Sequence, residues 1–176
     1  MKTGKRDPIE FRRSFLLNSL PRRINSTDSH LQIFDSYVAD GAIRLRSIRF
    51  PDTQEWTRLL EKRVLTDEVG KLEVYQIELT ETEYEEFKIF EGWEIRKNRY
   101  FCKLNGVKAE VDVYLGPLLG LYIGNVYFET YSKLIIYKVP AVSLAEITSN
   151  HFYSGENLVS RTFADVQAQR EKEKGR

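Results

Sequence analysis

The chain has 176 residues, of which 41% are hydrophobic and 30% are charged, a composition typical of one globular domain rather than of a disordered chain. Its formal net charge of +1 excludes an overall electrostatic attraction to DNA, RNA or anionic membrane, so an anion site must be a local cluster of Lys and Arg. The single cysteine, Cys102, excludes an internal disulfide, and the first residues lack the apolar core of a signal peptide. We therefore expect a cytoplasmic protein.

Most of the chain is predicted to form short β-strands, because segments rich in aromatic, aliphatic and β-branched residues alternate with turn residues. These segments are 11–17, 31–38, 42–50, 56–64, 72–79, 93–104, 107–114 and 121–128. The pair Asn105-Gly106 predicts a two-residue hairpin, since both residues tolerate positive φ.

One helix is predicted among the strands. Thr80-Glu-Thr-Glu has the pattern of a capping box, and Tyr84, Phe87, Ile89 and Phe90 follow with partly helical spacing. Residues 161–176 are polar and charged, so we expect a solvated tail after a domain that spans residues 1–160. The predicted fold is α+β but mainly antiparallel β, because many strands with short connections are best protected in a closed eight-stranded barrel with helices packed outside.

Charged residues recur at every second position of several predicted strands and so share one face of each strand. The sets are Glu10 and Arg12, Arg44 and Arg46, Gln76 and Glu78, Lys97 and Arg99, and Glu110 and Asp112, with Lys62 near the end of its own strand. The ordinary interpretation is the wet outer face of a half-buried sheet. The alternative is a charged barrel interior, because arginine predominates in the cationic pairs and matches phosphate oxygens with fixed donors.

Six segments of the chain resemble, in order and spacing, the motifs of one known family. They are Glu10-Phe-Arg12-Arg-Ser14-Phe-Leu-Leu, Arg44-Leu-Arg46, the strand that ends in Lys62, Lys97-Asn-Arg99-Tyr100, Glu110-Val-Asp112 with Gly116 and Gly120-Leu121, and Glu146-Ile-Thr148 with Tyr153-Ser-Gly-Glu-Asn-Leu158. The family is the CYTH superfamily, or triphosphate tunnel metalloenzymes, and the resemblance covers about residues 8–158. It implies a β-tunnel that holds a phosphate-bearing anion together with Mg²⁺ or Mn²⁺.

The chain departs from this pattern where the family holds its metal. Arg12 replaces the second glutamate of the opening motif and Ser14 its lysine, while Asn125 and Tyr127 stand where the family carries a later glutamate pair. Hard divalent cations require oxygen ligands, often carboxylates, which neither arginine nor tyrosine replaces. The metal ligands that the resemblance still implies are Glu10, Glu78, Glu110 and Asp112. The phosphate-binding residues that we predict are Arg12, Arg44, Arg46, Lys62, Lys97 and Arg99.

Two classes of function follow. In the first, the chain binds a triphosphate, polyphosphate or nucleotide in a cationic tunnel, Arg12 takes part of the space of the metal, and metal-dependent hydrolysis is weakened or lost. The alternative is a divergent Mg²⁺- or Mn²⁺-dependent triphosphate hydrolase; adenylyl cyclase activity has less support because no segment indicates a purine site. A third interpretation is a scaffold without ligand, in which the interior charges pair with one another. We expect neither a membrane nor a specific nucleic-acid sequence as partner, and the oligomeric state stays open.

Overall fold

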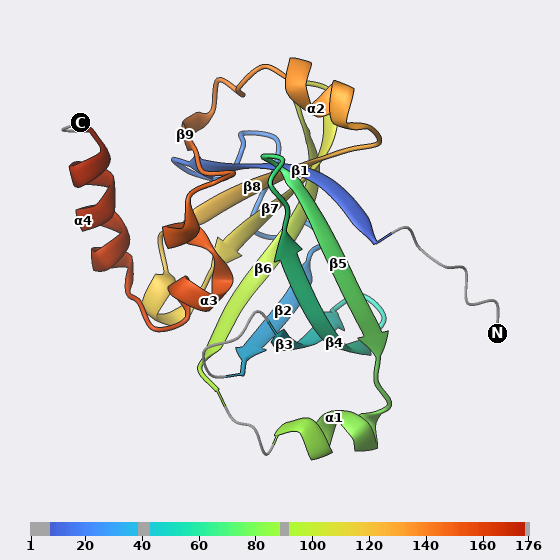
Figure 1. The fold of residues 1–176 in the computed structure, drawn as a ribbon. Coiled ribbons are helices and arrows are strands. Elements are labelled where there is room, and N and C mark those ends of the chain that lie inside the picture. The colour runs from blue at the N-terminus through green and yellow to red at the C-terminus, as the bar shows by residue number, and fades with distance from the viewer. Residues whose placement is uncertain (1–7, 39–42, 89–91, 175–176) are drawn as a thin grey trace.

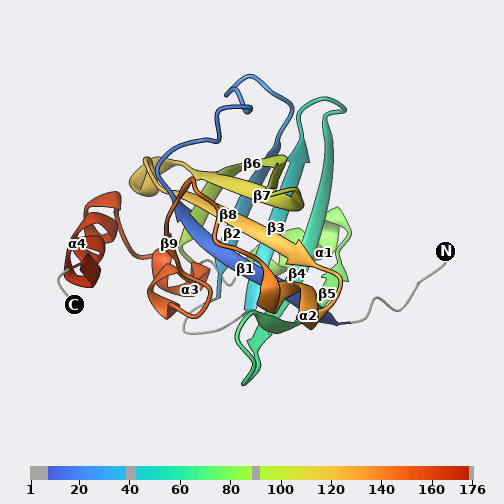
Figure 2. The same ribbon diagram turned by 90° about the horizontal axis from the view of Figure 1, so that it is seen from above.

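Eight antiparallel strands close into a barrel in the computed structural model, which describes residues 8–38, 43–88 and 92–174 (Figure 1, Figure 2). The strands are β1 (Ile9–Leu17), β2 (Leu31–Tyr37), β3 (Ile43–Phe50), β4 (Glu55–Leu65), β5 (Lys71–Glu78), β6 (Glu94–Leu104), β7 (Val107–Tyr114) and β8 (Tyr122–Phe128). Their order is β5-β4-β3-β2-β6-β7-β8-β1. The ring is closed by Ile9–Phe11 of β1, which pair with β5. The predicted closed barrel is confirmed.

Strands β2 to β5 and strands β6 to β8 each pair in sequence order, and the pairing of β2 with β6 and the pairings of β1 with β8 and β5 join the two groups. Between β6 and β7 the turn residues Asn105 and Gly106 have φ values of 46° and 80°, as the predicted two-residue hairpin requires. A ninth strand, β9 (Ser143–Glu146), pairs with the second half of β1 outside the barrel and was not predicted.

The helices lie around the barrel, with α1 at its lower end in Figure 1, α2 at its upper end, and α3 and α4 at one side. They are α1 (Glu81–Phe87), α2 (Tyr131–Ile136), α3 (Gly155–Leu158) and α4 (Phe163–Lys174), and two short turns are η2 (Gly116–Leu118) and η3 (His151–Tyr153). Helix α1 begins with the predicted capping box, in which Thr80 and Glu83 bond each other's backbone N–H groups. Ile89 and Phe90, predicted to extend this helix, lie outside the described residues.

Much of the apolar core lies outside the barrel wall rather than within it. Phe15, Val111 and Val126 are fully buried on the outer faces of β1, β7 and β8, beneath Leu20 and Tyr137. Because successive side chains of a strand point to opposite faces, the intervening residues of these strands point into the barrel. The usual arrangement of an antiparallel sheet, apolar within and polar without, is therefore reversed here.

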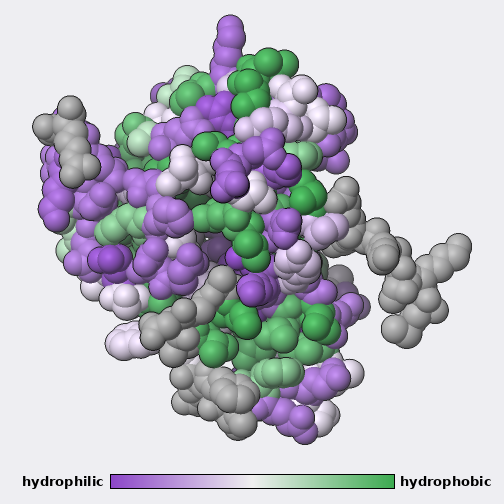
Figure 3. Space-filling model, in the orientation of Figure 1, coloured by the Kyte–Doolittle hydropathy of each residue, from purple (hydrophilic) through white to green (hydrophobic). Residues whose placement is uncertain are grey.

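The outer surface is not uniformly covered. Figure 3 shows hydrophobic side chains gathered on the lower part of this face, over β4, β5 and α1, and Ile43 and Ile77 are exposed. Within the described ranges, no helix is long and apolar enough to cross a membrane.

Residues 163–174, part of the segment expected to be a solvated tail, form the helix α4. Its Val166 is fully buried in a cluster with Leu158 and Tyr153, and Phe163 packs against the same cluster. Glu173 accepts hydrogen bonds from Asn150 and Tyr153. Two apolar side chains in its first half, Phe163 and Val166, thus attach an otherwise charged helix, which is why the composition alone indicated solvent.

We expect Val166→Ala to lower the free energy of unfolding by about 1–3 kcal/mol, because the change removes buried methyl groups and leaves a cavity. Urea unfolding monitored by circular dichroism measures the loss. The control is Val142→Ala, since Val142 is 44% exposed and its loss should change stability by less than about 0.5 kcal/mol. Equal effects of the two changes would show that α4 does not pack as described.

Candidate functional site

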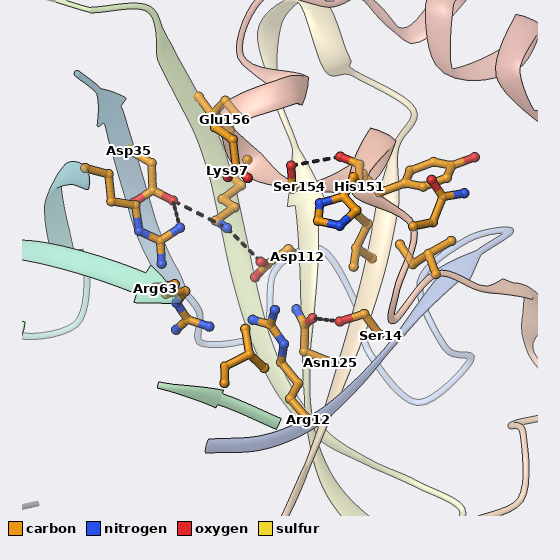
Figure 4. Close-up of a pocket in the computed structure, with 18 of the residues that line it drawn as sticks. Arg12, Ser14, Asp35, Arg63, Lys97, Asp112, Asn125, His151, Ser154 and Glu156 are labelled. Carbon is orange, nitrogen blue, oxygen red and sulfur yellow. Dashed lines mark hydrogen bonds and ion pairs between the residues drawn. The ribbon is translucent and has the colours of Figure 1, made fainter. Parts of the chain in front are cut away.

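The barrel encloses a cavity of about 160 Å³, far more than the ~10–15 Å³ that one water molecule needs (Figure 4). Charged side chains on β1, β2, β3, β4, β6 and β7 line most of it, and the segment 147–156 lines one end. Side chains from most strands of the barrel therefore reach the cavity, which is large enough to hold a small molecule.

A single network of ion pairs runs around this cavity. Its members are Arg12, Glu10, Arg63, Glu61, Arg44, Arg46, Asp35, Lys97, Asp112, Arg99 and Glu110, and both Arg44 and Arg46 connect Glu61 to Asp35. Six of these groups are cations and five are carboxylates, which leaves one positive charge in excess. A buried network of this kind is tolerable only because each charge has an opposite partner.

Asp35 is at the centre of the network, on β2. Its carboxylate, 1% exposed, accepts two hydrogen bonds from Arg46 at 2.6 and 2.8 Å and lies 3.4 Å from Nη1 of Arg44 and 3.5 Å from Nζ of Lys97. Burial raises the pKa of this carboxyl, but Arg44, Arg46 and Lys97 outweigh burial and hold the pKa well below its usual value. Asp35 therefore stays ionised and fixes three cations around the cavity.

A second buried carboxylate, Glu61 on β4, holds the arginines of the neighbouring strands. It contacts Arg44, accepts a 2.8 Å hydrogen bond from Arg63 and lies 3.8 Å from Arg46. Burial raises its pKa, but Arg44, Arg63 and Arg46 outweigh burial and lower it. Glu61 lies behind these guanidinium groups, which leaves the arginines facing the cavity.

Asp112 on β7 organises the third part of the network. It accepts hydrogen bonds from Arg99 at 2.6 and 2.8 Å, a bidentate pair, and lies 2.9 Å from Nζ of Lys97. Burial raises the pKa of Asp112, but Arg99 and Lys97 outweigh burial and lower it. Burial lowers the pKa of Lys97 to about 8, and its two aspartate partners offset only part of that effect. The ammonium of Lys97 thus bridges Asp35 and Asp112 at the cavity wall.

The remaining cations come from β1 and β4. Arg63 donates to Glu10 at 2.8 Å, and Nη1 of Arg12 lies 3.6 Å from the same carboxylate. Arg99 also contacts Glu110, which accepts a 2.7 Å hydrogen bond from the Tyr127 hydroxyl. Figure 4 shows Arg12 and Arg63 on the opposite side of the cavity from His151 and Glu156.

Two polar groups of the cavity wall have hydrogen-bonding capacity left over. Ser14 donates to Oδ1 of Asn125 at 2.8 Å, so the orientation of that buried amide leaves its NH₂ group directed away from Ser14, as Figure 4 shows. The Nε of Arg44 is buried without a partner among the described residues. An unpaired buried donor of a charged group costs free energy, and an anionic ligand would satisfy it.

The structure brings together five of the six cations predicted to bind phosphate: Arg12, Arg44, Arg46, Lys97 and Arg99 line one cavity. Lys62, the sixth predicted residue, is not among the residues that line the described cavity. It is exposed, because the side chains of its neighbours Glu61 and Arg63 point into the barrel and β4 alternates at every residue. Arg63, which the sequence analysis missed, lines the cavity in its place.

The four predicted metal ligands do not come together around one point where a metal ion could bind. Glu78 is exposed near the end of β5 and is not part of the cavity lining that the structure describes. The other three, Glu10, Glu110 and Asp112, lie in the network but are each bonded to an arginine. Among the described residues, no three His, Cys, Asp or Glu side chains come together as a metal site. The carboxylates present thus do not fit the divalent metal that the family resemblance implies.

The sequence analysis also missed Asp35 and Glu61, the two most central carboxylates. The available signal was an acidic residue between two apolar ones on the same face of a strand, since alternation places Ile33, Asp35 and Tyr37 together. At Glu61 the signal was the spacing of Glu61 and Arg63, which the motif ending in Lys62 obscured.

Known proteins resemble this chain in fold but not significantly in sequence. No protein-family model matches this sequence, and no curated protein matches it significantly. The fold is similar to the crystal structure of the inorganic triphosphatase NE1496, with a TM-score of 0.57 and 23% identity over 85% of this chain and 93% of that chain. A second crystal structure of NE1496 gives a TM-score of 0.58 at 22% identity, over 87% and 99% of the two chains. The PH1819 protein from Pyrococcus horikoshii gives 0.50 at 18% identity, over 72% and 82%.

The chain has the CYTH-type tunnel fold. The resemblance that the sequence motifs indicated is thereby confirmed at the level of the fold. A shared fold carries no function by itself, which must be argued from the groups that line the CYTH-type tunnel.

We expect the free energy of unfolding to fall as pH is lowered from about 5 to about 3. The pKa values of Asp35, Glu61 and Asp112 are lower in the folded chain than in the unfolded chain, so the stability they contribute is present above about pH 4 and is lost as the unfolded state takes up protons. Urea midpoints at the two pH values test this.

The paired variants are Asp35→Asn and Asp67→Asn, the second at an exposed site. Asp35→Asn should lose about 3–5 kcal/mol at neutral pH, because buried cations lose their partner, and should show a smaller acid dependence. Asp67→Asn should match the parent chain in both respects. A urea midpoint that does not move with pH would contradict the ionised network.

Proposed function

We propose that the chain binds a triphosphate-bearing anion inside the tunnel and that this binding requires no divalent metal. The observation that carries the proposal is a cavity lined by five arginines and one lysine, Arg12, Arg44, Arg46, Arg63, Lys97 and Arg99. Arginine presents planar pairs of donors that match the oxygens of a phosphate, and all six groups surround one space.

The charge balance of the network supports an anionic ligand. The five carboxylates leave one cation in excess and hold the guanidinium groups in place, which lowers the conformational cost of binding. Glu10, Glu61 and Glu110 are absent from the described cavity lining, whereas their arginine partners are present in it. The surface that a ligand meets is therefore more cationic than the network as a whole.

The donors left over in the wall support the same ligand. The buried Nε of Arg44 has no partner among the described residues, and the amide NH₂ of Asn125 is directed away from its bonded neighbour Ser14. Phosphate oxygens accept hydrogen bonds and satisfy both groups. A scaffold whose charges only paired with one another would have no need of a polar cavity of this size, so the third interpretation has less support.

The residues around Glu10 support binding without a divalent metal. Arg12 and Arg63 both contact Glu10, so positive charge is supplied there by guanidinium groups that belong to the chain. A divalent cation at this carboxylate would be repelled by two neighbouring positive charges. The alternative, a divergent triphosphate hydrolase, rests on the fold that the chain shares with the inorganic triphosphatase NE1496.

The first test is calorimetric titration of the chain with tripolyphosphate in EDTA and again in excess Mg²⁺. We expect binding in EDTA that Mg²⁺ does not strengthen. Binding that requires Mg²⁺ and is accompanied by release of phosphate would overturn the proposal and favour the hydrolase. Absence of binding under both conditions would remove phosphate as the ligand.

In the same titration, Arg12→Gln should weaken tripolyphosphate binding by roughly 10–100-fold, the value of a hydrogen bond to a charged group of about 1.5–3 kcal/mol. Arg12 suits this test because its one ion pair among the described residues, with Glu10, is long at 3.6 Å, so its loss disturbs the fold little. Lys62→Gln is the matched control, since Lys62 is exposed outside the barrel and its loss should leave the affinity unchanged. An equal loss in both variants would indicate attraction by overall charge only.

A second test asks whether Arg12 takes the place of a metal ion, and it introduces carboxylates at the positions where the family resemblance implies them. In the double variant Arg12→Glu with Asn125→Glu, one new carboxylate lies two residues from Glu10 on β1, and the other lies on β8 directly opposite Glu110 of β7. We expect this variant, unlike the parent chain, to bind Mn²⁺ in a paramagnetic resonance titration. If it gains neither Mn²⁺ binding nor turnover, Arg12 does not stand in for the metal.

A further inference from the structure

The last half of strand β5 has a paired neighbour on one side only. Strand β1 covers the first half, where Ile9–Phe11 pair with Lys71–Glu73 and the N–H of Val74 donates to the carbonyl of Pro8 at 2.7 Å. Strand β4 pairs with the other side of β5 to its end, and in Figure 1 β5 continues past β1 toward α1. On the side of β1, no described residue pairs with the backbone of residues 75–78. We call this half-strand the open edge.

The backbone groups of every second residue of β5 point to the open edge. The N–H of Val74 points to β1, whereas that of Leu79 donates to the carbonyl of Arg58 on β4 at 2.8 Å. Because the N–H and carbonyl groups of a strand alternate between its two sides, those of Gln76 and Glu78 point away from β4. Two donors and two acceptors thus lie in a row without a backbone partner among the described residues, which is a template for another strand.

The open edge contains neither lysine nor proline, the residues that commonly protect the edge of a sheet. It reads Tyr75-Gln-Ile-Glu78, and all four residues are exposed, Tyr75 by 50% and Ile77 by 61%. Ile77 lies beside Leu60 of β4, which lies beside Leu45 of β3, and Figure 3 shows hydrophobic side chains gathered over this part of the surface. Unpaired backbone groups beside apolar side chains are the features by which an edge accepts an added strand.

We propose that the open edge pairs with the open edge of a second copy of the chain, so that two barrels join through an antiparallel β5–β5 contact about a two-fold axis. Two identical edges are complementary in this arrangement, because each N–H of one copy meets a carbonyl of the other. The contact lies on the barrel wall and is independent of any ligand in the tunnel.

The register of the contact follows from the groups that are already bonded. An axis at Gln76 would need the N–H of Val74, which already donates to Pro8. With the axis at Ile77, Gln76 of one copy lies opposite Glu78 of the second copy, and each such pair exchanges two hydrogen bonds. The contact therefore contains four backbone hydrogen bonds, two on each side of the axis.

The side chains are compatible with this register. The two Ile77 side chains face each other across the axis, so the apolar row that begins at Leu45 and Leu60 continues from one barrel to the other. Gln76 lies beside Glu78 of the second copy, so an amide meets a carboxylate and no like charges are opposed along residues 75–78. A second copy therefore matches the open edge in its backbone groups and in its side chains.

Sedimentation velocity of the full chain at concentrations from about 1 to about 500 µM measures the association. We expect a reversible monomer–dimer equilibrium, because a strand pair of this length buries less than the roughly 1,000 Å² of a stable interface. Ile77→Lys should weaken dimerisation by about tenfold or more, since two ammonium groups would face each other on the axis. The control Ile136→Lys changes an apolar side chain that is 77% exposed on α2, and it should leave dimerisation unchanged.

Glu78→Pro tests the backbone pairing directly. Proline is tolerated at a sheet edge but removes the N–H that would reach the second copy. We expect it to weaken dimerisation by roughly 10–100-fold, because two of the four hydrogen bonds are lost. Glu78→Gln, which keeps the N–H, should dimerise like the parent chain.

Ile77→Cys tests the register. Facing residues of a non-hydrogen-bonded pair have Cα atoms about 4.5 Å apart, a separation that a disulfide spans. Oxidised glutathione should therefore link Ile77→Cys into a covalent dimer and leave the control Ile136→Cys monomeric.

Three results would overturn the proposal: a parent chain that stays monomeric over the whole concentration range, a dimer that neither Ile77→Lys nor Glu78→Pro weakens, or equal cross-linking of the two cysteine variants. Thermal unfolding midpoints that match the parent chain show that the substitutions act on association rather than on folding, as expected at exposed positions.

Discussion

The ion-pair network inside the barrel is the interaction on which the rest of this structure depends. A charged interior is costly unless every charge has a partner, and Asp35, Glu61 and Asp112 supply those partners for the arginines and for Lys97. In turn, the apolar side chains that alternate with these charges point outward, where Leu20, Tyr137 and Tyr84 of α1 pack on them. The cover on these parts of the barrel is thus a consequence of what the barrel contains.

The same network explains why the carboxylates of this tunnel do not present themselves to a metal. Glu10 and Glu110 are engaged by guanidinium groups, and Asp112 is held by both Arg99 and Lys97. Each of these arginine or lysine contacts favours an anion and disfavours a cation at the same place, because positive charges attract the first and repel the second. A tunnel that keeps its cations and ties its carboxylates to arginine is suited to holding phosphate groups.

The segment 147–156, which lines one end of the cavity, connects the C-terminal helix to the barrel. Helix α4 contributes Val166 to the apolar cluster and Glu173 to the hydrogen bonds of Asn150 and Tyr153, so a charged helix at the periphery positions the wall of the interior.

The sequence by itself determined the strands, the Asn105-Gly106 hairpin, the closed barrel and the recurrence of charge at every second residue, because each depends on local conformational preference or on the alternation of a strand. Only the tertiary structure decided which phase of that alternation faces inward. A shift of one residue moves a side chain to the opposite face, which is why Glu61 and Arg63 line the network while Lys62 is exposed. Barrel closure and packing also decided that Asp35 meets three cations and that the segment 147–156 forms one end of the cavity, since these contacts join residues far apart in the chain.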